Sequence, residues 1–216
     1  MIVVLLGPPG AGKGTQGERI AAALGLPKIS TGDVIRDAMS AGTPLGLEAK
    51  AFYDRGDLVP DAVIMRIVRE VLAQPGQARG VVLDGVVRTV PQAEGLSTVL
   101  GDLGRALDLV MLFEIADELL VARLSGRTVC SGCGMPFTGH QPGERHAECA
   151  KTPKGSLVRR KDDEPEAVRN RLRVYHEQTA PVVAWYRSHG ARIAQIDAVG
   201  TLDQVTARAF AALGVP

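Results

Sequence analysis

A glycine-rich segment with a single lysine, Gly7-Pro8-Pro9-Gly10-Ala11-Gly12-Lys13-Gly14-Thr15, has the composition of a phosphate-binding loop. It stands between an apolar run, Ile2–Leu6, and a helical pattern over Gln16–Leu24. A glycine-rich turn between strand and helix lets backbone N–H groups point into one concavity, where the lysine adds charge and the helix its dipole. The general pattern places Ser or Thr directly after the lysine, whereas here Gly14 intervenes. The segment therefore predicts a variant loop that binds a nucleoside triphosphate.

Arginine dominates the cations of this chain, with 19 Arg against 6 Lys. A high-GC genome would give the same bias without any function, but arginine is also the better bidentate ligand for phosphate. Any one of these arginines, taken alone, would more often be a solvated surface residue. Six candidates come from five separated segments and could meet only through the fold: Arg36, Arg88, Arg123, Arg127, Arg160 and Arg171.

One carboxylate has a position that suits a magnesium ion. Asp84 follows the apolar run Val81–Leu83 and precedes Gly85, which places its carboxylate at the end of a buried strand. Such a carboxylate can face Mg²⁺ through water. An ordinary turn residue at a strand end would look the same. Asp33 is a second candidate for this role.

Length and composition narrow the class of protein. The 216 residues allow one sizeable core with small inserted lobes, and 45% hydrophobic with 23% charged residues is typical of a soluble globular protein. A net charge of +1 argues against a globally basic nucleic-acid clamp. The longest apolar runs are strand-sized and the first lacks the basic residues of a signal peptide, so we expect no membrane span. Three cysteines, all within Cys130–Cys149, make a poor disulfide framework and indicate a cytoplasmic protein.

Short apolar runs alternate with helical patterns, which predicts a parallel sheet covered by helices on both faces. The expected strands are Ile2–Leu6, Pro27–Ile29, Val81–Leu83, Leu109–Phe113 and Arg192–Ile196. With the glycine-rich loop they predict an α/β P-loop fold of three layers around a five-stranded parallel sheet.

Three helices have clear limits in the sequence. Asp61, after Pro60, is a candidate N-cap for an apolar stripe that ends at Leu72. Pro165 suits the first turn of a long helix, and the last helix should span Leu202–Leu213 before Gly214. We expect the long helix to turn four side chains toward the core, namely Val168, Leu172, Tyr175 and Thr179.

Two stretches interrupt this alternation. Residues 30–59 hold two short helical patterns, and residues 126–163 hold the cysteines, many Gly and Pro residues and almost no helical periodicity. Both fit insertions at the carboxyl edge of the sheet, where open α/β folds bind their ligands. The predicted core then comprises residues 1–29, 60–125 and 164–216, with a small helical lobe at 30–59 and a lid at 126–163.

The loop and the motifs after it resemble the nucleoside monophosphate kinases, above all the adenylate kinase family of the long-lid bacterial type. Ser30-Thr31-Gly32-Asp33 with Arg36 resembles the entry to the monophosphate site of that family, and Asp84-Gly85-x-x-Arg88-Thr89 with Gln92 resembles its second monophosphate segment. Arg123 and Arg127 flank the start of the lid, and Arg160-Lys161-Asp162-Asp163 resembles its end. The motifs follow the order of the family over essentially the whole chain.

The resemblance implies the reversible, Mg²⁺-dependent reaction ATP + AMP ⇌ 2 ADP in adenine nucleotide homeostasis and salvage, by a monomer without nucleic-acid or membrane partners. Phosphoryl transfer asks the protein for in-line positioning and for cations around the transferred group. By resemblance, the catalytic residues are Lys13, Asp84, Arg88, Arg127, Arg160 and Arg171. The implied ATP site is Gly10, Ala11, Gly12, Lys13, Gly14, Thr15, Arg123, Arg127 and Gly200. The implied AMP site is Thr31, Arg36, Asp57, Leu58, Val59, Gly85, Arg88, Gln92, Arg160 and Arg171.

The chain departs from the family at one segment of the predicted AMP site. Val86-Val87 stands where the family usually has Phe-Pro. A proline there can take the cis peptide form, which costs a valine about 2.5–4 kcal/mol. We therefore expect a different course for the loop that carries Arg88, with an effect on AMP affinity more than on ATP binding. Gln92 could read a base edge, since its amide both donates and accepts, or it could bond a loop backbone.

The cysteines have the spacing of a structural zinc site. Cys130-x-x-Cys133 forms one turn and Cys149 follows. Many long-lid members of the resembled family have four ligands in two such pairs. For the fourth ligand we favour His146, with Thr152 at the family position and His140 as further candidates. A hydrogen-bonded lid without metal and redox-active thiols are the alternatives.

Two other functions deserve comparison with the kinase that uses AMP. A kinase for UMP or CMP would share the phosphate loop, but Thr31, Gln92 and the long lid argue against it. A catalytically silent nucleotide sensor or a nucleic-acid-binding zinc module would not need the full arginine set, and the lid carries only Phe137 as an aromatic residue for stacking on bases.

Overall fold

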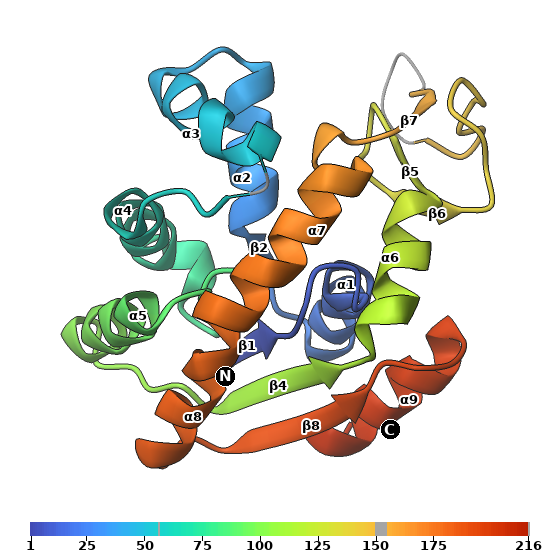
Figure 1. Cartoon of the computed structure of the whole chain (residues 1–216). Helices are drawn as coiled ribbons and strands as arrows, with labels where there is room; N and C mark the ends of the chain where they lie inside the picture. Colours follow the sequence, from blue (N-terminus) through green and yellow to red (C-terminus); the bar gives the residue numbers. More distant parts are fainter. Residues whose placement is uncertain (56, 150–154, 216) are drawn as a thin grey trace.

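The computed structural model describes residues 1–55, 57–149 and 155–215 and has a parallel five-stranded sheet at its centre (Figure 1). The strand order is β2-β3-β1-β4-β8. The strands are β1 Ile2–Leu6, β2 Lys28–Ser30, β3 Val81–Asp84, β4 Leu109–Glu114 and β8 Ile193–Asp197. Each agrees with its predicted range to within one residue at either end, and the predicted α/β fold with a five-stranded parallel sheet is confirmed.

The register of the strands brings the chemically important segments to one edge of the sheet. Asp84 pairs with Leu5 of β1 on one side and with Ser30 of β2 on the other. The segments that follow these strands are the glycine-rich loop and the Thr31 region. Because the strands are parallel, these segments and Asp84 all lie at the carboxyl edge.

The sheet is buried on both faces, as expected for a parallel sheet. Ile2, Val4 and Leu6 of β1 belong to one apolar cluster, while Val3 and Leu5 belong to the other, as the two-residue repeat of a strand requires. The first cluster is covered by α4 Asp61–Leu72, α5 Val90–Asp102 and α8 Ala180–Ser188. The second is covered by α1 Lys13–Leu24, α6 Asp117–Ser125, α7 Pro165–Val174 and α9 Leu202–Leu213.

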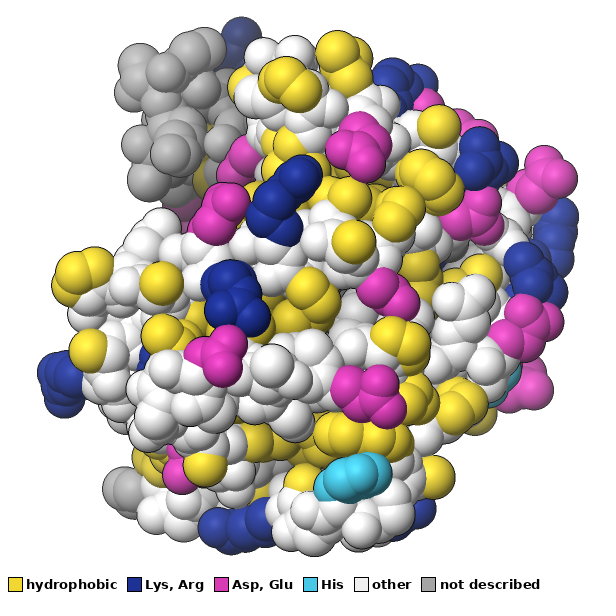
Figure 2. Space-filling model, turned by 90° about the vertical axis from the view of Figure 1, so that its left-hand side faces the viewer, with side chains coloured by type: hydrophobic (Ala, Val, Ile, Leu, Met, Phe, Trp, Pro, Cys, Tyr) yellow, Lys and Arg dark blue, Asp and Glu magenta, His cyan; other side chains and the backbone are white. Residues whose placement is uncertain are grey.

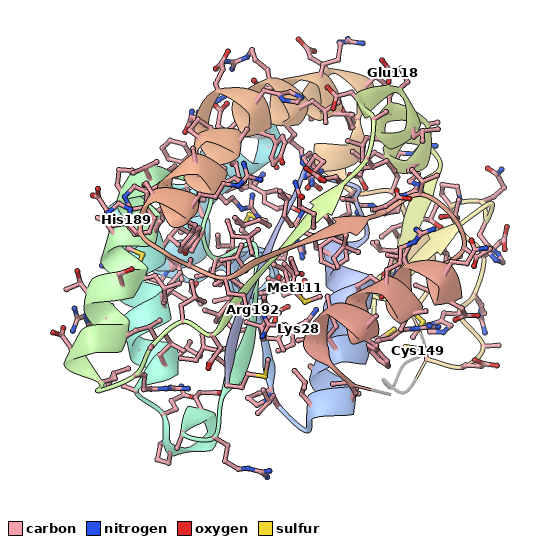
Figure 3. All side chains as sticks on the ribbon, turned by 90° about the horizontal axis from the view of Figure 1, so that it is seen from below. Lys28, Met111, Glu118, Cys149, His189 and Arg192 are labelled. Atoms are coloured by element: carbon pink, nitrogen blue, oxygen red, sulfur yellow. The ribbon has the colours of Figure 1, made fainter. Side chains whose placement is uncertain are left out.

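Two inserted regions stand on the carboxyl edge of the sheet, with α7 between them in Figure 1. One contains α2 Thr31–Ser40 and α3 Pro44–Arg55. The other contains an antiparallel sheet of order β6-β5-β7, made of β5 Arg127–Cys130, β6 Pro136–Thr138 and β7 Leu157–Val158. Seen from below in Figure 3, Met111 of β4 lies near the centre of the molecule and Cys149 of the second region at its margin.

Several local expectations need correction. The first helix begins at Lys13 rather than Gln16, because Gly12 takes the N-cap position. Pro60, not Asp61, is the N-cap residue of α4, and the Asp61 carboxylate instead accepts hydrogen bonds from α5 and the residue before it. Tyr175 is half-buried rather than a core residue.

The start of the long helix and the limits of the last helix agree with expectation. Pro165 lies in the first turn of α7, and α9 spans Leu202–Leu213 with Gly214 after it in the left-handed conformation, at φ 71°. A π-helical turn, Tyr175–Thr179, joins α7 to α8. Short 3₁₀ turns at Pro75–Gln77 and Lys161–Asp163 complete the elements of the described residues.

Candidate functional site

The loop between β1 and α1 is built to receive an anion. Gly7 has φ 142°, and a Cβ there would lie 2.5 Å from the Phe113 carbonyl oxygen, so only glycine fits. Gly12 has φ 88° and caps α1 without any side-chain hydrogen bond to the first-turn N–H groups. The Lys13 ammonium donates to the carbonyl oxygens of Gly7 and Pro8 at 2.7 and 2.8 Å, which folds the lysine back along the loop. Free N–H groups at a helix N-terminus favour phosphate.

The loop lies in strongly positive surroundings. Burial lowers the pKa of Lys13 to about 8, and the guanidinium groups of Arg88, Arg171 and Arg127 act in the same direction, against the carboxylate of Asp84. Burial and the charge of Arg171 likewise hold the pKa of Arg88 below its usual range. These cations lower one another's pKa because their positive charges repel. A bound polyanion would offset that repulsion, so the arrangement favours binding of a polyphosphate.

The fold brings the dispersed arginines together, as the sequence predicts. A large cleft at the carboxyl edge is lined by the glycine-rich loop, Asp84 and all six candidate arginines, which are Arg36, Arg88, Arg123, Arg127, Arg160 and Arg171. Every residue of the implied ATP site lines this cleft, Gly200 included, and so does every residue of the implied catalytic set. The Arg123 guanidinium donates to the Ala198 carbonyl oxygen at 3.1 Å, which ties α6 to the loop before Gly200.

Two buried carboxylates hold the arginines at the end of the lid. Asp163, whose side chain is fully buried, accepts from Arg127 at 2.6 and 2.7 Å and from Arg171 at 2.9 Å. Asp162 also pairs with Arg171, at 2.9 Å. Although burial acts in the opposite direction, the charges of Arg171 and Arg160 hold the pKa of Asp162 below its usual range. Asp162 is therefore an anion, and both carboxyl groups position guanidinium groups around the cleft.

A smaller pocket adjoins the cleft and contains the implied AMP site. Its lining includes Thr31, Arg36, Asp57, Leu58, Val59, Gly85, Arg88, Gln92 and Arg171, whereas Arg160 lines only the adjoining cleft. The Thr31 hydroxyl donates to the Gly85 carbonyl oxygen at 2.8 Å. Asn170 of α7 donates to the Asp57 carboxylate at 2.7 Å and to the Arg55 carbonyl oxygen at 2.8 Å, which fastens the start of this segment to α7.

Sequence reasoning missed the roles of two polar residues that line this pocket, Tyr53 and Asp162, and of one beside it, Asp61. Tyr53 donates its hydroxyl hydrogen to Asp162 at 3.0 Å and lies 3.5 Å from Arg36. Asp162 itself stood in a basic run, and its role as a counter-charge could have been inferred from that context. Asp61 contacts Gln92, although its position before a helix suggested a cap. Asp33, a candidate magnesium ligand, forms an ion pair with Arg36.

The two valines that depart from the family pattern are both buried in the core cluster, with exposed fractions of 0% and 1% for Val86 and Val87. Arg88 follows them and lies in the pocket, where its Nε donates to the Gly85 carbonyl oxygen at 3.0 Å. Its own carbonyl oxygen accepts from Thr179 at 2.8 Å. The π-helical turn that carries Thr179 therefore supports the loop of Arg88 from behind.

Four side chains of the lid converge on a point that suits a metal ion. The ligand atoms of Cys130, Cys133, His146 and Cys149 lie within 4.8 Å of one another. The Sγ atoms of Cys130 and Cys149 are 3.6 Å apart, close to the edge of about 3.8 Å in a tetrahedron with Zn–S bonds of about 2.3 Å. The Cys133 Sγ lies 3.4 Å from His146 Nδ1.

Two glycines, Gly132 and Gly155, pack closely against the thiols of this cluster. A Cβ at Gly155 would lie 2.4 Å from the Cys130 Sγ, and one at Gly132 would lie 3.1 Å from the Cys149 Sγ. His140 is exposed and pairs with Glu144 at 2.8 Å, away from the thiols, while Thr152 lies outside the described residues. The donor set, its spacing and its cradle thus fit zinc, with His146 as the fourth ligand.

Comparison with known proteins agrees with this geometry. A family model described as "Adenylate kinase" matches residues 5–191. A protein of Gemmatimonas aurantiaca named "Adenylate kinase" is 62% identical over 215 residues, which cover 100% of both chains. Proteins with the same name from Salinispora tropica and Syntrophobacter fumaroxidans are 47% and 43% identical, over 99% of this chain and 98% and 100% of theirs. A family model that matches most of the chain and a relative that is 62% identical over its full length show that the chain belongs to the adenylate kinase family.

Proposed function

We propose that this phosphotransferase catalyses ATP + AMP ⇌ 2 ADP with Mg²⁺ and so maintains the balance of adenine nucleotides. The observation that carries the proposal is the layout of the two cavities. The phosphate loop lines one, the Thr31 and Gln92 segments line the other, and both share Arg36, Arg88 and Arg171. Two nucleotides bound in this way would meet end to end at the shared arginines.

The proposed mechanism needs positioning and charge rather than covalent chemistry from the protein. Lys13 and the N–H groups of the loop hold the triphosphate, and Arg36 and Arg88 hold the monophosphate. Arg127, Arg160 and Arg171 surround the group in transit and stabilise the charge of its transition state. Asp84 is buried at the strand end and faces the loop, with its Oδ2 3.4 Å from where a Cβ of Gly14 would stand. Mg²⁺ carried in by the nucleotide would neutralise phosphate charge, and Asp84 would hold its water ligands.

The experiment that tests the reaction is a panel of acceptors. Purified protein with Mg·ATP should convert AMP to ADP and leave CMP, UMP and GMP largely untouched. Faster turnover of CMP or UMP than of AMP would instead favour a pyrimidine nucleotide kinase. Nucleotide binding without turnover of any acceptor would favour a sensor.

We further propose that residues 30–59 and 126–163 move as lobes over the core, residues 1–29, 60–125 and 164–216. Both lobes stand on the sheet edge beside the cleft, and closing them would exclude water from the transferred phosphoryl group. A bisubstrate analogue that joins two adenosines through a phosphate chain should reduce the radius of gyration in solution scattering. An unchanged radius with the analogue bound would contradict lobe closure.

We propose that the four-residue cluster of the lid binds one structural Zn²⁺, since four protein ligands leave no coordination position for water or substrate.

We also propose that the protein is a monomer and is located in the cytoplasm. The thiols support a reducing compartment, because they cluster as metal ligands do. On the face seen in Figure 2, charged side chains of both signs lie between small groups of hydrophobic ones. Among the described residues, no helix has the length and hydropathy needed to cross a bilayer.

A further inference from the structure

The side-chain amide of Gln92 is held between two partners of opposite kind. Its Oε1 accepts a hydrogen bond from the Arg88 backbone N–H at 2.7 Å, and its Nε2 donates to the Asp61 carboxylate at 2.7 Å. A backbone N–H can only donate and a carboxylate can only accept, so the chemistry of the partners fixes which amide atom is oxygen and which is nitrogen. Turning the amide over would place donor against donor and acceptor against acceptor.

Asp61 is itself oriented by its neighbours. It is the first residue of α4, and its Oδ1 also accepts from the Thr89 hydroxyl at 3.1 Å. Thr89 is the N-cap residue of α5 and accepts from the Gln92 backbone N–H at 3.2 Å. Helices α4 and α5 lie side by side in Figure 1 and contact each other. The carboxylate therefore sits at a fixed point beside the pocket.

The amide keeps one N–H and one oxygen lone pair for a ligand, because a primary amide has two of each. Gln92 is 1% exposed and lines the pocket, so an unmatched polar atom there would be costly. The Watson–Crick edge of adenine offers an amino donor beside a ring-nitrogen acceptor. The same edge of a 6-oxopurine offers an oxygen acceptor beside an N–H donor, which is the reverse order.

Thr31 independently favours an amino group on the bound base. Its hydroxyl hydrogen is already donated to the Gly85 carbonyl oxygen, so toward the pocket the hydroxyl presents lone pairs. An amino group on the base suits such an acceptor, whereas a 6-oxo group does not.

We infer that Asp61 is a positioning residue that fixes the polarity of the Gln92 amide and thereby makes the monophosphate pocket select a 6-aminopurine over a 6-oxopurine. This inference rests on the proposed function, because it concerns the acceptor AMP against inosine monophosphate (IMP). Asp61 acts through Gln92.

The test is the ratio of kcat/KM for AMP to that for IMP in Asp61→Asn. The asparagine amide can turn either its oxygen or its NH₂ group toward Gln92, so the acceptor-only partner is lost while volume is kept. The ratio should fall about tenfold, chiefly through KM for the acceptor, with KM for ATP unchanged, since one mismatched buried hydrogen bond is relieved. Asp61→Ser, whose hydroxyl also donates and accepts, serves as a second variant if Asp61→Asn does not fold.

Asp102→Asn is the matched control. Asp102, at the last residue of α5, bonds to Arg69 of α4 at 3.0 Å and so joins the same two helices away from the pocket. It should leave the ratio unchanged. In the Gln92→Ala background, Asp61→Asn should have no further effect on the ratio, because the path through the amide is gone.

Three results would overturn the inference. A ratio within twofold of the wild-type value in Asp61→Asn, while AMP remains the preferred acceptor, would refute the clamp and leave the proposed function standing. An equal fall of the AMP-to-IMP ratio in Asp102→Asn would show that Asp61 acts only by joining the two helices. A wild-type protein that prefers CMP or UMP to AMP would overturn the proposed function and the clamp together.

Discussion

The sheet-bearing core and the lid are stabilised in different ways. The core has two large apolar clusters, one on each face of the sheet, with strands such as β1 buried at every position. Among the described residues, the apolar cluster of the lid has only three buried members. Two of them are cysteines, Cys130 and Cys149, and the third is Leu157. The strands of the lid have four, three and two residues. Apolar burial can hold the core, whereas the lid depends on its cluster of three cysteines and His146 and on the buried Asp163 ion pairs.

This difference separates stability from catalysis. In the core, Lys13 and the arginines proposed to hold phosphate lie outside the two apolar clusters, so they can be substituted with little loss of packing. In the lid, two of the residues proposed to hold zinc, Cys130 and Cys149, also make up most of the buried apolar cluster. Substitutions in the two regions should therefore affect different measurements.

The largest effect should come from Lys13→Ala in the core. Loss of the charge at the phosphate loop should lower kcat/KM by about a thousandfold or more, because the charge acts most strongly at the transition state. The thermal midpoint should not fall, because burial of an ammonium group whose pKa is lowered to about 8 costs folding free energy that the alanine variant does not have to offset. Steady-state kinetics and calorimetry measure the two quantities.

Lys50→Ala is the control for this substitution. Lys50 is a half-exposed lysine of α3 that pairs with Asp54, outside the residues that line the two cavities. Its removal should leave kcat/KM within about twofold, as expected for a surface ion pair. A loss of tenfold or less in Lys13→Ala would show that the phosphate loop is misassigned.

The lid should show the opposite pattern when the proposed zinc ion is removed. Chelation or Cys133→Ser should lower the thermal midpoint by about 5 °C or more, because metal binding to the folded form is linked to folding. Activity at 25 °C should stay within about threefold. Elemental analysis of protein purified without chelator should find one zinc per chain, and its absence would favour a hydrogen-bonded lid.

The fourth ligand can be assigned within the same experiment. His146→Ala should abolish zinc binding and lower the midpoint as Cys133→Ser does. His140→Ala is the matched control, since His140 is exposed and bonded to Glu144. Thr152→Ala should also retain zinc. Zinc kept in His146→Ala and lost in Thr152→Ala would reassign the ligand without removing the site.

The same contrast decides what could be predicted from the sequence. Core strands such as β3 contain a continuous apolar run between turns, here Val81–Leu83, and these runs predicted them. The phosphate loop combines glycine spacing with a strand before it and a helix after it, and both the segment and its place were predictable. Lid strands such as Pro136–Thr138 carry no such pattern, because they are too short and too exposed to alternate.

Contacts across the fold were the hardest to predict. Tyr53 and Asp162 are 109 residues apart, and neither position has a local pattern that indicates the other. Asp61 was predicted to be a helix cap from its place after Pro60. Its contact with Gln92 could not be predicted, because that contact depends on how two helices pack. The thiol cluster was predictable because its members are close in sequence and have few other chemical uses together.

Alkaline pH should affect the core site in a particular direction. The pKa of Lys13 is about 8 in the folded protein against 10.5 as its ordinary value, so the free enzyme loses this charge above pH 8. We expect kcat/KM for ATP to fall there, by up to about tenfold per pH unit. The stability contribution has the opposite sign. Between pH 8 and 10.5 the unfolded chain binds the extra proton, so this group makes the fold more stable as pH rises.

A pH series of kcat/KM and of the thermal midpoint would check both signs. Bound triphosphate restores negative charge beside Lys13, so the profile of kcat should fall at higher pH than that of kcat/KM. A kcat/KM that stays level to about pH 9.5 would contradict a neutral Lys13 in the free enzyme.

The smallest effect should come from the core segment that departs from the family pattern. Val87 is 1% exposed and directly precedes Arg88, whose guanidinium lies in the monophosphate pocket. Val87→Pro fixes φ at this position and restricts the backbone before Arg88. We expect KM for AMP to fall about twofold to threefold, with KM for ATP unchanged and a midpoint shift of less than about 3 °C.

Adding Val86→Phe separates this backbone effect from packing. Val86 is fully buried, so a phenyl ring there should cost about 1–3 kcal/mol through overpacking and lower the thermal midpoint. KM for AMP should nevertheless stay below the wild-type value, because the restricted backbone remains. An effect confined to KM for ATP in either variant would show that this segment does not serve the AMP pocket.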